Sequence, residues 1–157
     1  MSYAKGTSVP IERSLSELRS VVAKYGADGF GFAEEENPPR AMVMFRLGTR
    51  QVRLIVPFPP RDDKRFTHEK GTWRRRSDGA AFSLFVDEKK RCWRAVLLVV
   101  KAKFEAVSSG ISTIEREFLA DLVLPNGRVV HEELAPRLAA WSKTGEVVAL
   151  IPESASP

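Results

Sequence analysis

The chain has 157 residues, of which 43% are hydrophobic and 29% charged, and its formal net charge is +5. This length and composition are typical of one globular domain and exclude a disordered or collagen-like chain. A single cysteine excludes an intrachain disulfide framework and a thiolate zinc cluster. The sequence has neither the roughly 20-residue apolar run of a membrane span nor the apolar stretch of a secretion signal, so we expect a cytoplasmic protein without a membrane partner.

The first predicted helix begins at Ser14. Residues 1–13 are expected to form a flexible lead-in, and Ser14 with Glu17 matches a capping box in which the serine is the N-cap. Gly26 ends the helix with left-handed backbone. One face of the segment carries apolar side chains at helical spacing, namely Leu15, Leu18, Val21, Val22 and Tyr25.

Three strands are predicted next, over residues 28–34, 41–47 and 50–56. Glycine and phenylalanine alternate in the first segment, the second is apolar with β-branched and aromatic residues, and the third alternates in the period of a strand. A tight turn at Gly48 joins the second segment to the third. The three segments together predict an antiparallel meander.

A long loop and a long helix are predicted after the meander. Residues 58–79 contain prolines, glycines and many charges without a sustained period, which is typical of a functional or mobile loop. Residues 80–108 contain neither proline nor glycine and predict one helix of roughly 42 Å that packs on the sheet. Its apolar stripe consists of Phe82, Val86, Trp93, Val96, Leu97, Val100, Phe104 and Val107.

Two small elements follow the long helix. The segment from Ser112 to Glu115 matches a second capping box and opens a short helix. Residues 122–130 predict a small hairpin, because the Asn126-Gly127 pair tolerates the positive φ angles of a primed turn.

A last helix ends near Gly145 and is marked by three apolar residues, Leu134, Leu138 and Trp141. Residues 147–151 are expected to pair with an edge strand or to dock on the core, and residues 152–157 form a polar tail. Residues 14–151 therefore predict a single α+β domain, in which a three-stranded antiparallel meander packs against one long helix, with shorter helices and a small C-terminal hairpin.

Positive charge is concentrated in the middle of the chain. Residues 60–103 contain 13 basic and 6 acidic side chains, whereas the rest of the chain has 12 basic and 14 acidic ones. Cationic groups attract phosphates whatever the base sequence, and exposed aromatic rings stack on unpaired bases, so this segment indicates a nucleic-acid interface. The alternative is that the cations solvate a loop and a helix face while the tryptophans belong to the core.

The predicted interface spans the loop and the outer face of the long helix. Trp73, together with Phe66, is the candidate for base stacking, whereas we expect Trp93 inside the protein. Contact with about 6 to 10 phosphates would lower the affinity by several orders of magnitude as salt is added. The residues expected to hold phosphates are Arg61, Lys64, Arg65, Lys70, Arg74, Arg75, Arg76, Lys89, Lys90, Arg91 and Arg94.

Residues for catalysis or metal binding are sparse. His68, His131 and Cys92 lie far apart in the sequence, and no nucleotide-binding or nucleophile-elbow motif is present, so we expect neither a metal nor a cofactor. His131 opens the last helix beside two glutamates, a pattern that indicates compensation of the helix dipole. Cys92 is expected to be a buried small hydrophobe, although flanking cations would lower its pKa if it were exposed.

Five segments resemble small proteins that tailed phages and prophages encode. The resemblance covers residues 7–151 and rests on the order of the segments TSVPIERS, KYGADGF, RQVRLIVPFP, CWRAVLLVVKAKFEAV and FLADLVLPNGR. It implies a phage-encoded protein that acts in the cytoplasm of the bacterial host. It assigns no catalytic residue to this chain.

Three functions are compatible with these observations. The first is a non-catalytic nucleic-acid-binding accessory protein of phage origin that acts in replication, recombination or DNA protection, with DNA preferred to RNA. The second is a phage module whose basic loop binds an acidic surface of a host or phage protein and which inhibits or modifies a host enzyme. The third is a magnesium-dependent nuclease built on Glu115, Glu117 and Asp121, for which solvated helix carboxylates are the alternative. We expect binding rather than catalysis, and a homo-oligomer is compatible with each function.

Overall fold

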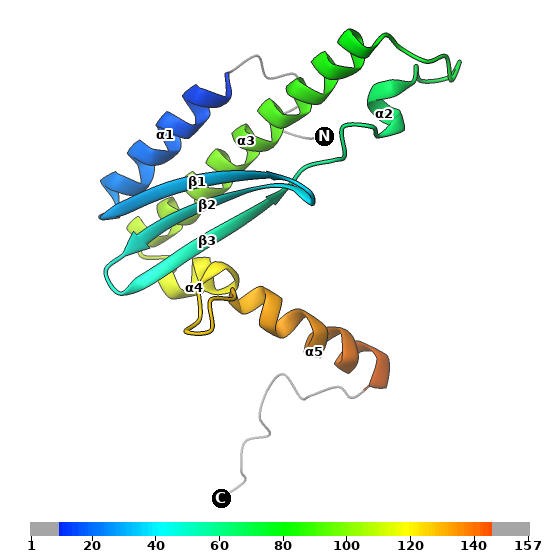
Figure 1. The fold of residues 1–157 in the computed structure, drawn as a ribbon. Helices are drawn as coiled ribbons and strands as arrows, with labels where there is room; N and C mark the ends of the chain where they lie inside the picture. Colours follow the sequence, from blue (N-terminus) through cyan, green and yellow to red (C-terminus); the bar gives the residue numbers. More distant parts are fainter. Residues whose placement is uncertain (1–9, 146–157) are drawn as a thin grey trace, which may run out of the picture.

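A three-stranded antiparallel sheet with helices on one face forms the centre of the fold in the computed structural model, which describes residues 10–145 (Figure 1). The strand order is β1-β2-β3, as expected of a meander, so the predicted α+β class is confirmed. Helices α1 and α3 lie side by side across the sheet. The elements are α1 (Ile11–Lys24), β1 (Gly29–Glu36), β2 (Pro39–Leu47), β3 (Arg50–Pro57), α2 (Lys64–Thr67), α3 (Asp78–Ser108), α4 (Ile114–Phe118), the short 3-10 helix η1 (Leu119–Asp121) and α5 (Val130–Thr144).

The sheet buries one of its two faces. Side chains alternate between faces along a strand, and the register places Val43 of β2 between Phe32 of β1 and Leu54 of β3. Gly48, with φ of 60°, allows the two-residue turn that joins Leu47 to Arg50. The buried residues of β2 and β3 are Ala41, Val43, Phe45, Leu47, Val52, Leu54 and Val56.

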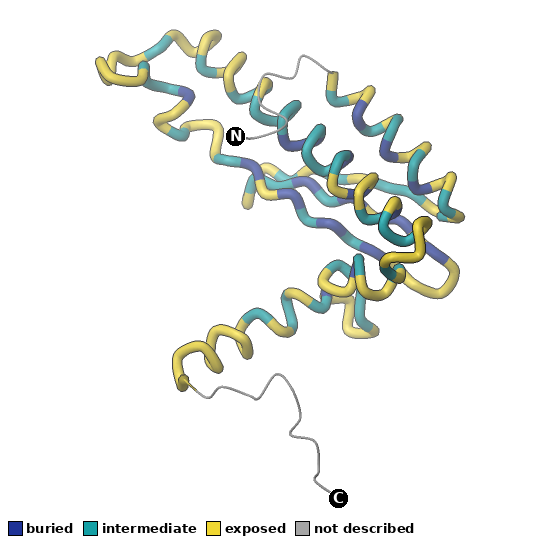
Figure 2. Tube along the Cα trace, turned by 180° about the vertical axis from the view of Figure 1, so that it is seen from behind, coloured by how far each residue is buried: buried dark blue, intermediate teal, exposed yellow. Residues whose placement is uncertain are grey.

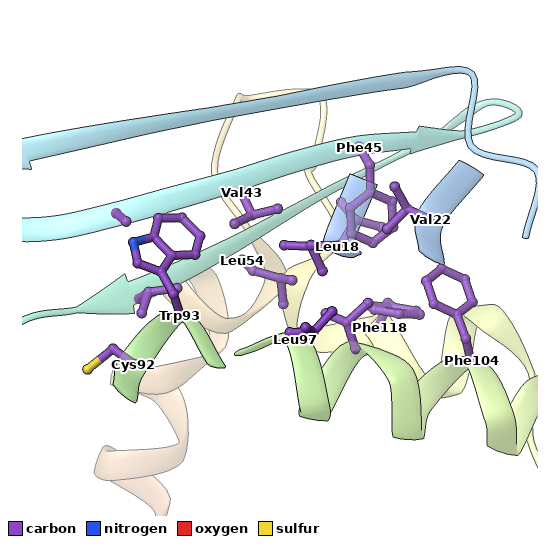
Figure 3. Packing of buried hydrophobic residues seen from close by; sticks show 14 of the residues in the cluster. Leu18, Val22, Val43, Phe45, Leu54, Cys92, Trp93, Leu97, Phe104 and Phe118 are labelled. Carbon is purple, nitrogen blue, oxygen red and sulfur yellow. The ribbon is translucent and has the colours of Figure 1, made fainter. Parts of the chain in front are cut away.

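The hydrophobic core lies between this face and the helices (Figure 3). Leu18 and Val22 of α1 and the second half of α3 contribute fully buried side chains, and Phe118 of α4 closes one end. Trp93 is fully buried, as expected, and its Nε1 donates a hydrogen bond to Glu34 Oε1 at 3.3 Å. This bond satisfies the only polar atom of the buried indole.

The N-cap of helix α1 lies four residues earlier than predicted. Pro10 is the N-cap, with φ of -58° and ψ of 148°, and its carbonyl accepts a hydrogen bond from the Ser14 amide. Ser14 lies inside the helix and is 1% exposed, so its predicted role as N-cap is wrong, and residues 11–13 are helical rather than part of a flexible segment. The physical reason is that proline preorganises the backbone for a helix start without a side-chain cap.

Helix α3 divides into two halves with different environments. Its buried residues all lie from Cys92 onward, whereas Phe82 near its start is 46% exposed. The expectation that the whole stripe packs on the sheet is therefore wrong for the first half. That half instead contacts α2, a short helix within the segment predicted to be a loop, and Phe66 of α2 packs on Phe85.

The segment after α3 contains the predicted short helix and hairpin, with two local differences. Thr113 rather than Ser112 caps α4, because its side chain accepts the Arg116 amide. The hairpin is held by one bridge, between Val123 and Val129, and its turn is not of the primed type. The Gly127 amide donates to the Leu124 carbonyl and Gly127 has the positive φ, so a type I turn with a left-handed glycine replaces it.

Helix α5 ends at Gly145, as predicted, and extends away from the sheet (Figures 1 and 2). None of its residues is buried, and Leu134, Leu138 and Trp141 are all exposed. The strand predicted over residues 147–151 and the polar tail lie outside the described residues. Within residues 10–145, no helix is both long and apolar enough to cross a membrane.

Candidate nucleic-acid interface

The connection between α2 and α3 is a small hydrogen-bonded hairpin rather than an irregular loop. His68 and Arg75 form an antiparallel bridge, the Glu69 amide donates to the Arg74 carbonyl at 2.8 Å, and the Arg76 amide donates to the Thr67 carbonyl at 2.8 Å. The hairpin projects beyond the start of α3, where most of its residues are exposed (Figures 1 and 2). We call residues 68–76 the basic hairpin.

Arg76 holds the base of the basic hairpin together. Its Nη1 lies 3.1 Å from the Phe66 carbonyl oxygen and 3.4 Å from that of Arg65, and it also donates to the His68 carbonyl. Charge-assisted bonds of this kind are stronger than neutral ones. Arg76 is half-buried and committed to these carbonyls, so its guanidinium ties the hairpin to α2 instead of standing free for a phosphate.

Trp73 is presented at the tip of the basic hairpin. Its side chain is 68% exposed, and its φ of 55° makes it the non-glycine residue with left-handed backbone among residues 10–145. The Trp73 amide donates to the Glu69 carbonyl at 3.1 Å, and the Thr72 hydroxyl donates to Glu69 Oε2 at the same distance. Left-handed backbone is costly for a bulky residue, and such residues concentrate at binding sites. The tip therefore keeps a large apolar ring in water on a fixed backbone.

The residues near Trp73 in the sequence of the basic hairpin include cations that are unpaired or weakly paired. Lys70 and Arg74 are exposed, and no side-chain hydrogen bond or ion pair holds them among the described residues. Arg75 lies 4.0 Å from Asp78, but both side chains are more than three-quarters exposed, so this pair contributes little. Lys64, the first residue of α2, is exposed, and before that helix the Arg61 guanidinium lies 4.8 Å from the centroid of the Phe82 ring.

The cations predicted on α3 are, in contrast, paired with carboxylates. Lys89 Nζ lies 2.6 Å from Glu34 Oε2, and Arg91 Nη2 lies 2.6 Å from Glu88 Oε1. Lys90 pairs with Asp87 at 3.1 Å, Arg94 with Glu17 at 3.3 Å, and Arg65 of α2 with Asp63 at 3.1 Å. The excess of positive charge is thus carried by the hairpin and the start of α2, and the structure does not bring the α3 cations into one unpaired patch with it.

The acidic partners on α1 and α3 are held in the ionised form. A hydrogen bond from Arg91 lowers the pKa of Glu88, and partial burial opposes this effect. A hydrogen bond from Lys101 lowers the pKa of Glu17, with further attraction from Arg94. At neutral pH both carboxylates are therefore charged, and their cations stay neutralised.

Phe66 is not available for base stacking. It is only 4% exposed, and its ring packs edge-on against Phe85 with centroids 5.8 Å apart. Trp93 is fully buried, as predicted, so Trp73 is the one exposed residue among the three aromatic residues, Phe66, Trp73 and Trp93, that the sequence placed beside cations. Phe66 serves instead as the apolar anchor of the segment that presents the hairpin.

The sequence did not identify the residues that shape the tip. Glu69 and Thr72 hold the turn through their side chains, and Gly71, with φ of 95°, completes it. The Gly71-Thr72 pair was the available signal, because glycine beside a hydroxyl residue is typical of a tight turn.

The other candidate chemistry does not assemble into a site. Glu115 pairs with Arg50, and Asp121 Oδ2 lies 3.9 Å from Lys103 Nζ. Among residues 10–145, no group of three or more His, Cys, Asp or Glu side chains is placed to hold a metal ion. Cys92 is buried, and burial raises the pKa of its thiol despite the nearby Arg91. Glu132 Oε2 accepts the Val129 amide at the start of α5, which is a structural role.

Comparisons of the chain with protein-family models, with curated proteins and with solved structures found no match. The function of the protein is therefore inferred from the geometry of the basic hairpin.

Proposed function

We propose that the protein is a non-catalytic nucleic-acid-binding accessory factor that uses the basic hairpin as its interface. The observation that carries the proposal is the exposed indole of Trp73, which is held on a hydrogen-bonded turn and followed directly by two arginines that are free or weakly paired. An aromatic ring beside cations is the combination that polynucleotide-binding surfaces use. The resemblance to phage proteins adds the expectation that the factor acts in replication, recombination or DNA protection in the bacterial host, with DNA as ligand.

The number of phosphate contacts that we expect is smaller than the number predicted from the sequence. Lys70, Arg74 and Arg75 supply three cations at the tip, and Arg61 with Lys64 adds two beside α2. Contact with about 3 to 5 phosphates of a single strand gives a slope of log affinity against log salt of about -2 to -3.5. A fourfold rise in salt then weakens binding about 20- to 130-fold, far less than a patch that included α3 would give.

Fluorescence anisotropy with labelled DNA tests the proposal. The double variant R74A/R75A is expected to lose affinity and to show a flatter salt dependence, because it removes two phosphate contacts. The matched control K90A/R94A removes the same charge from paired positions on α3 and is expected to bind almost as the unaltered protein does. Equal losses in the two variants, or no DNA binding at low salt, would contradict the proposal.

A second function, the binding of a host or phage protein, is favoured by helix α5. Leu138 is 52% exposed and Trp141 50% exposed on a helix without buried residues. Exposed apolar residues that lie close together on a helix are typical of protein-binding surfaces. Recovery of one stoichiometric protein from a nuclease-treated bacterial lysate, lost in the variant L138S/W141S, would favour this function over the first.

A further inference from the structure

We infer that the ligand of the basic hairpin is an unpaired strand, one base of which stacks on the indole of Trp73. The inference rests on the proposed function and names the class of nucleic acid that the same site takes. The exposure of the ring, the chemistry of the residues beside it and the charge at the start of α3 support this ligand.

The exposed ring can stack only on a base whose face is not covered by neighbouring bases. A base inside a duplex is covered on both faces by its neighbours and offers only its edges in the grooves. The side chain of Trp73 is an indole with a broad face and one N–H donor, which suits stacking and carries little edge recognition. At 68% exposure and with its backbone tied to Glu69, the ring is accessible to an extruded or unpaired base.

The charges near the ring match a strand more closely than a duplex groove. Arg74 and Arg75 follow Trp73 directly and Lys70 lies three residues before it in the same hairpin, so exposed cations are available to the phosphates that flank a stacked base. Readout of a duplex commonly places a helix in the major groove. The start of α3 would be the nearest such helix, but its first turn carries Asp78, whose side chain is 97% exposed and only weakly paired. This carboxylate repels the phosphates of a groove.

The test compares three polymers of equal length: oligo(dT), an abasic single strand, and a DNA duplex. The abasic strand retains the phosphates but has no base to stack. W73A is expected to bind oligo(dT) about 5- to 150-fold more weakly than the unaltered protein, the range of one base–aromatic stack. The same variant should bind the abasic strand with unchanged affinity, and W73F should retain most of the affinity for oligo(dT). The duplex is expected to bind more weakly than oligo(dT).

The outcomes separate this inference from the proposed function. If the duplex binds as tightly as oligo(dT) and W73A weakens neither, the inference is wrong while the proposed function stands. If W73A weakens binding to the abasic strand as much as to oligo(dT), the ring does not stack and the inference is also wrong. If none of the three polymers binds at low salt, both fail. Because Trp73 is exposed and outside the core, W73A and W73F are expected to melt at nearly the temperature of the unaltered protein. This measurement verifies that each variant is folded.

Discussion

Arg76 offers the sharpest test of how the basic hairpin is held. Its Nη1 lies near three carbonyl oxygens, those of Arg65, Phe66 and His68, but the nitrogen has two hydrogens and can donate to two of them at a time. A hydrogen bond from a charged donor contributes about 1.5 to 3 kcal/mol, and partial exposure of the side chain reduces this by about half. R76A removes both bonds and should therefore destabilise the closed hairpin by about 1.5 to 3 kcal/mol.

Native-state hydrogen exchange measures this local change. The amides at positions 69 and 76, whose bonds close the hairpin, are expected to exchange about 13- to 160-fold faster in R76A than in the unaltered protein. Amides of the core strands should be unaffected, because the hairpin lies outside the core cluster. R74A is the control, since its side chain has no hydrogen bond or ion pair among the described residues. Exchange rates of the two hairpin amides that stay within about threefold of the unaltered protein would refute the reasoning.

Three further predictions concern the core and its ion pairs. L97A removes a fully buried side chain and is expected to lower the free energy of unfolding by about 2 to 5 kcal/mol in urea titration; a loss below 1 kcal/mol, the scale of a surface change, would contradict the core assignment. E88Q should lower the free energy of unfolding by up to about 1 kcal/mol at neutral pH. Because the pKa of Glu88 is lowered in the folded state, this loss of stability is complete above the ordinary pKa of 4.5 and disappears as the pH falls through the pKa of the folded protein. A loss of stability that persists in acid would argue against the pair with Arg91. Cys92 should react with iodoacetamide slowly in the folded protein and rapidly in urea, because burial raises its pKa and blocks access; fast labelling of the folded protein would show that the thiol is open.

Local patterns in the sequence predicted most of the secondary structure. Strand alternation, helical spacing and the glycine at the end of α5 each depend on neighbouring residues, and the meander, α3 and α5 followed from them. The differences arose where two local signals competed. Ser14 matched a capping box but Pro10 began the helix, and Asn126-Gly127 matched a primed turn but the bond from Gly127 to Leu124 closed a different one.

The extent of the candidate site could not be predicted in the same way, because charge pairing depends on the tertiary fold. Lys89 meets Glu34 across 55 positions of the chain, and Arg94 meets Glu17 across 77. These pairs form only when β1 and α1 pack beside α3, so the sequence showed cations on α3 without their partners. Pairs such as Lys90 with Asp87, three positions apart on one helix, were in principle visible.

The burial of Phe66 shows a related limit. An aromatic residue among lysines and arginines has the same sequence environment whether it points to solvent or inward, and only the position of Phe85 on α3 decides between them. Trp73 was identified correctly as exposed, but its left-handed backbone follows from the turn around it and had no signature in its own residue type.

The separation of Phe66 and Phe85 from the main apolar cluster has a consequence for how the molecule tolerates change. Phe66 is buried but does not belong to the cluster that joins the sheet, α1 and the second half of α3. We therefore expect the hairpin and its anchor to open locally while the rest of the protein stays folded. On this expectation, sequence variation in the hairpin, including changes of length or charge, would have little effect on global stability.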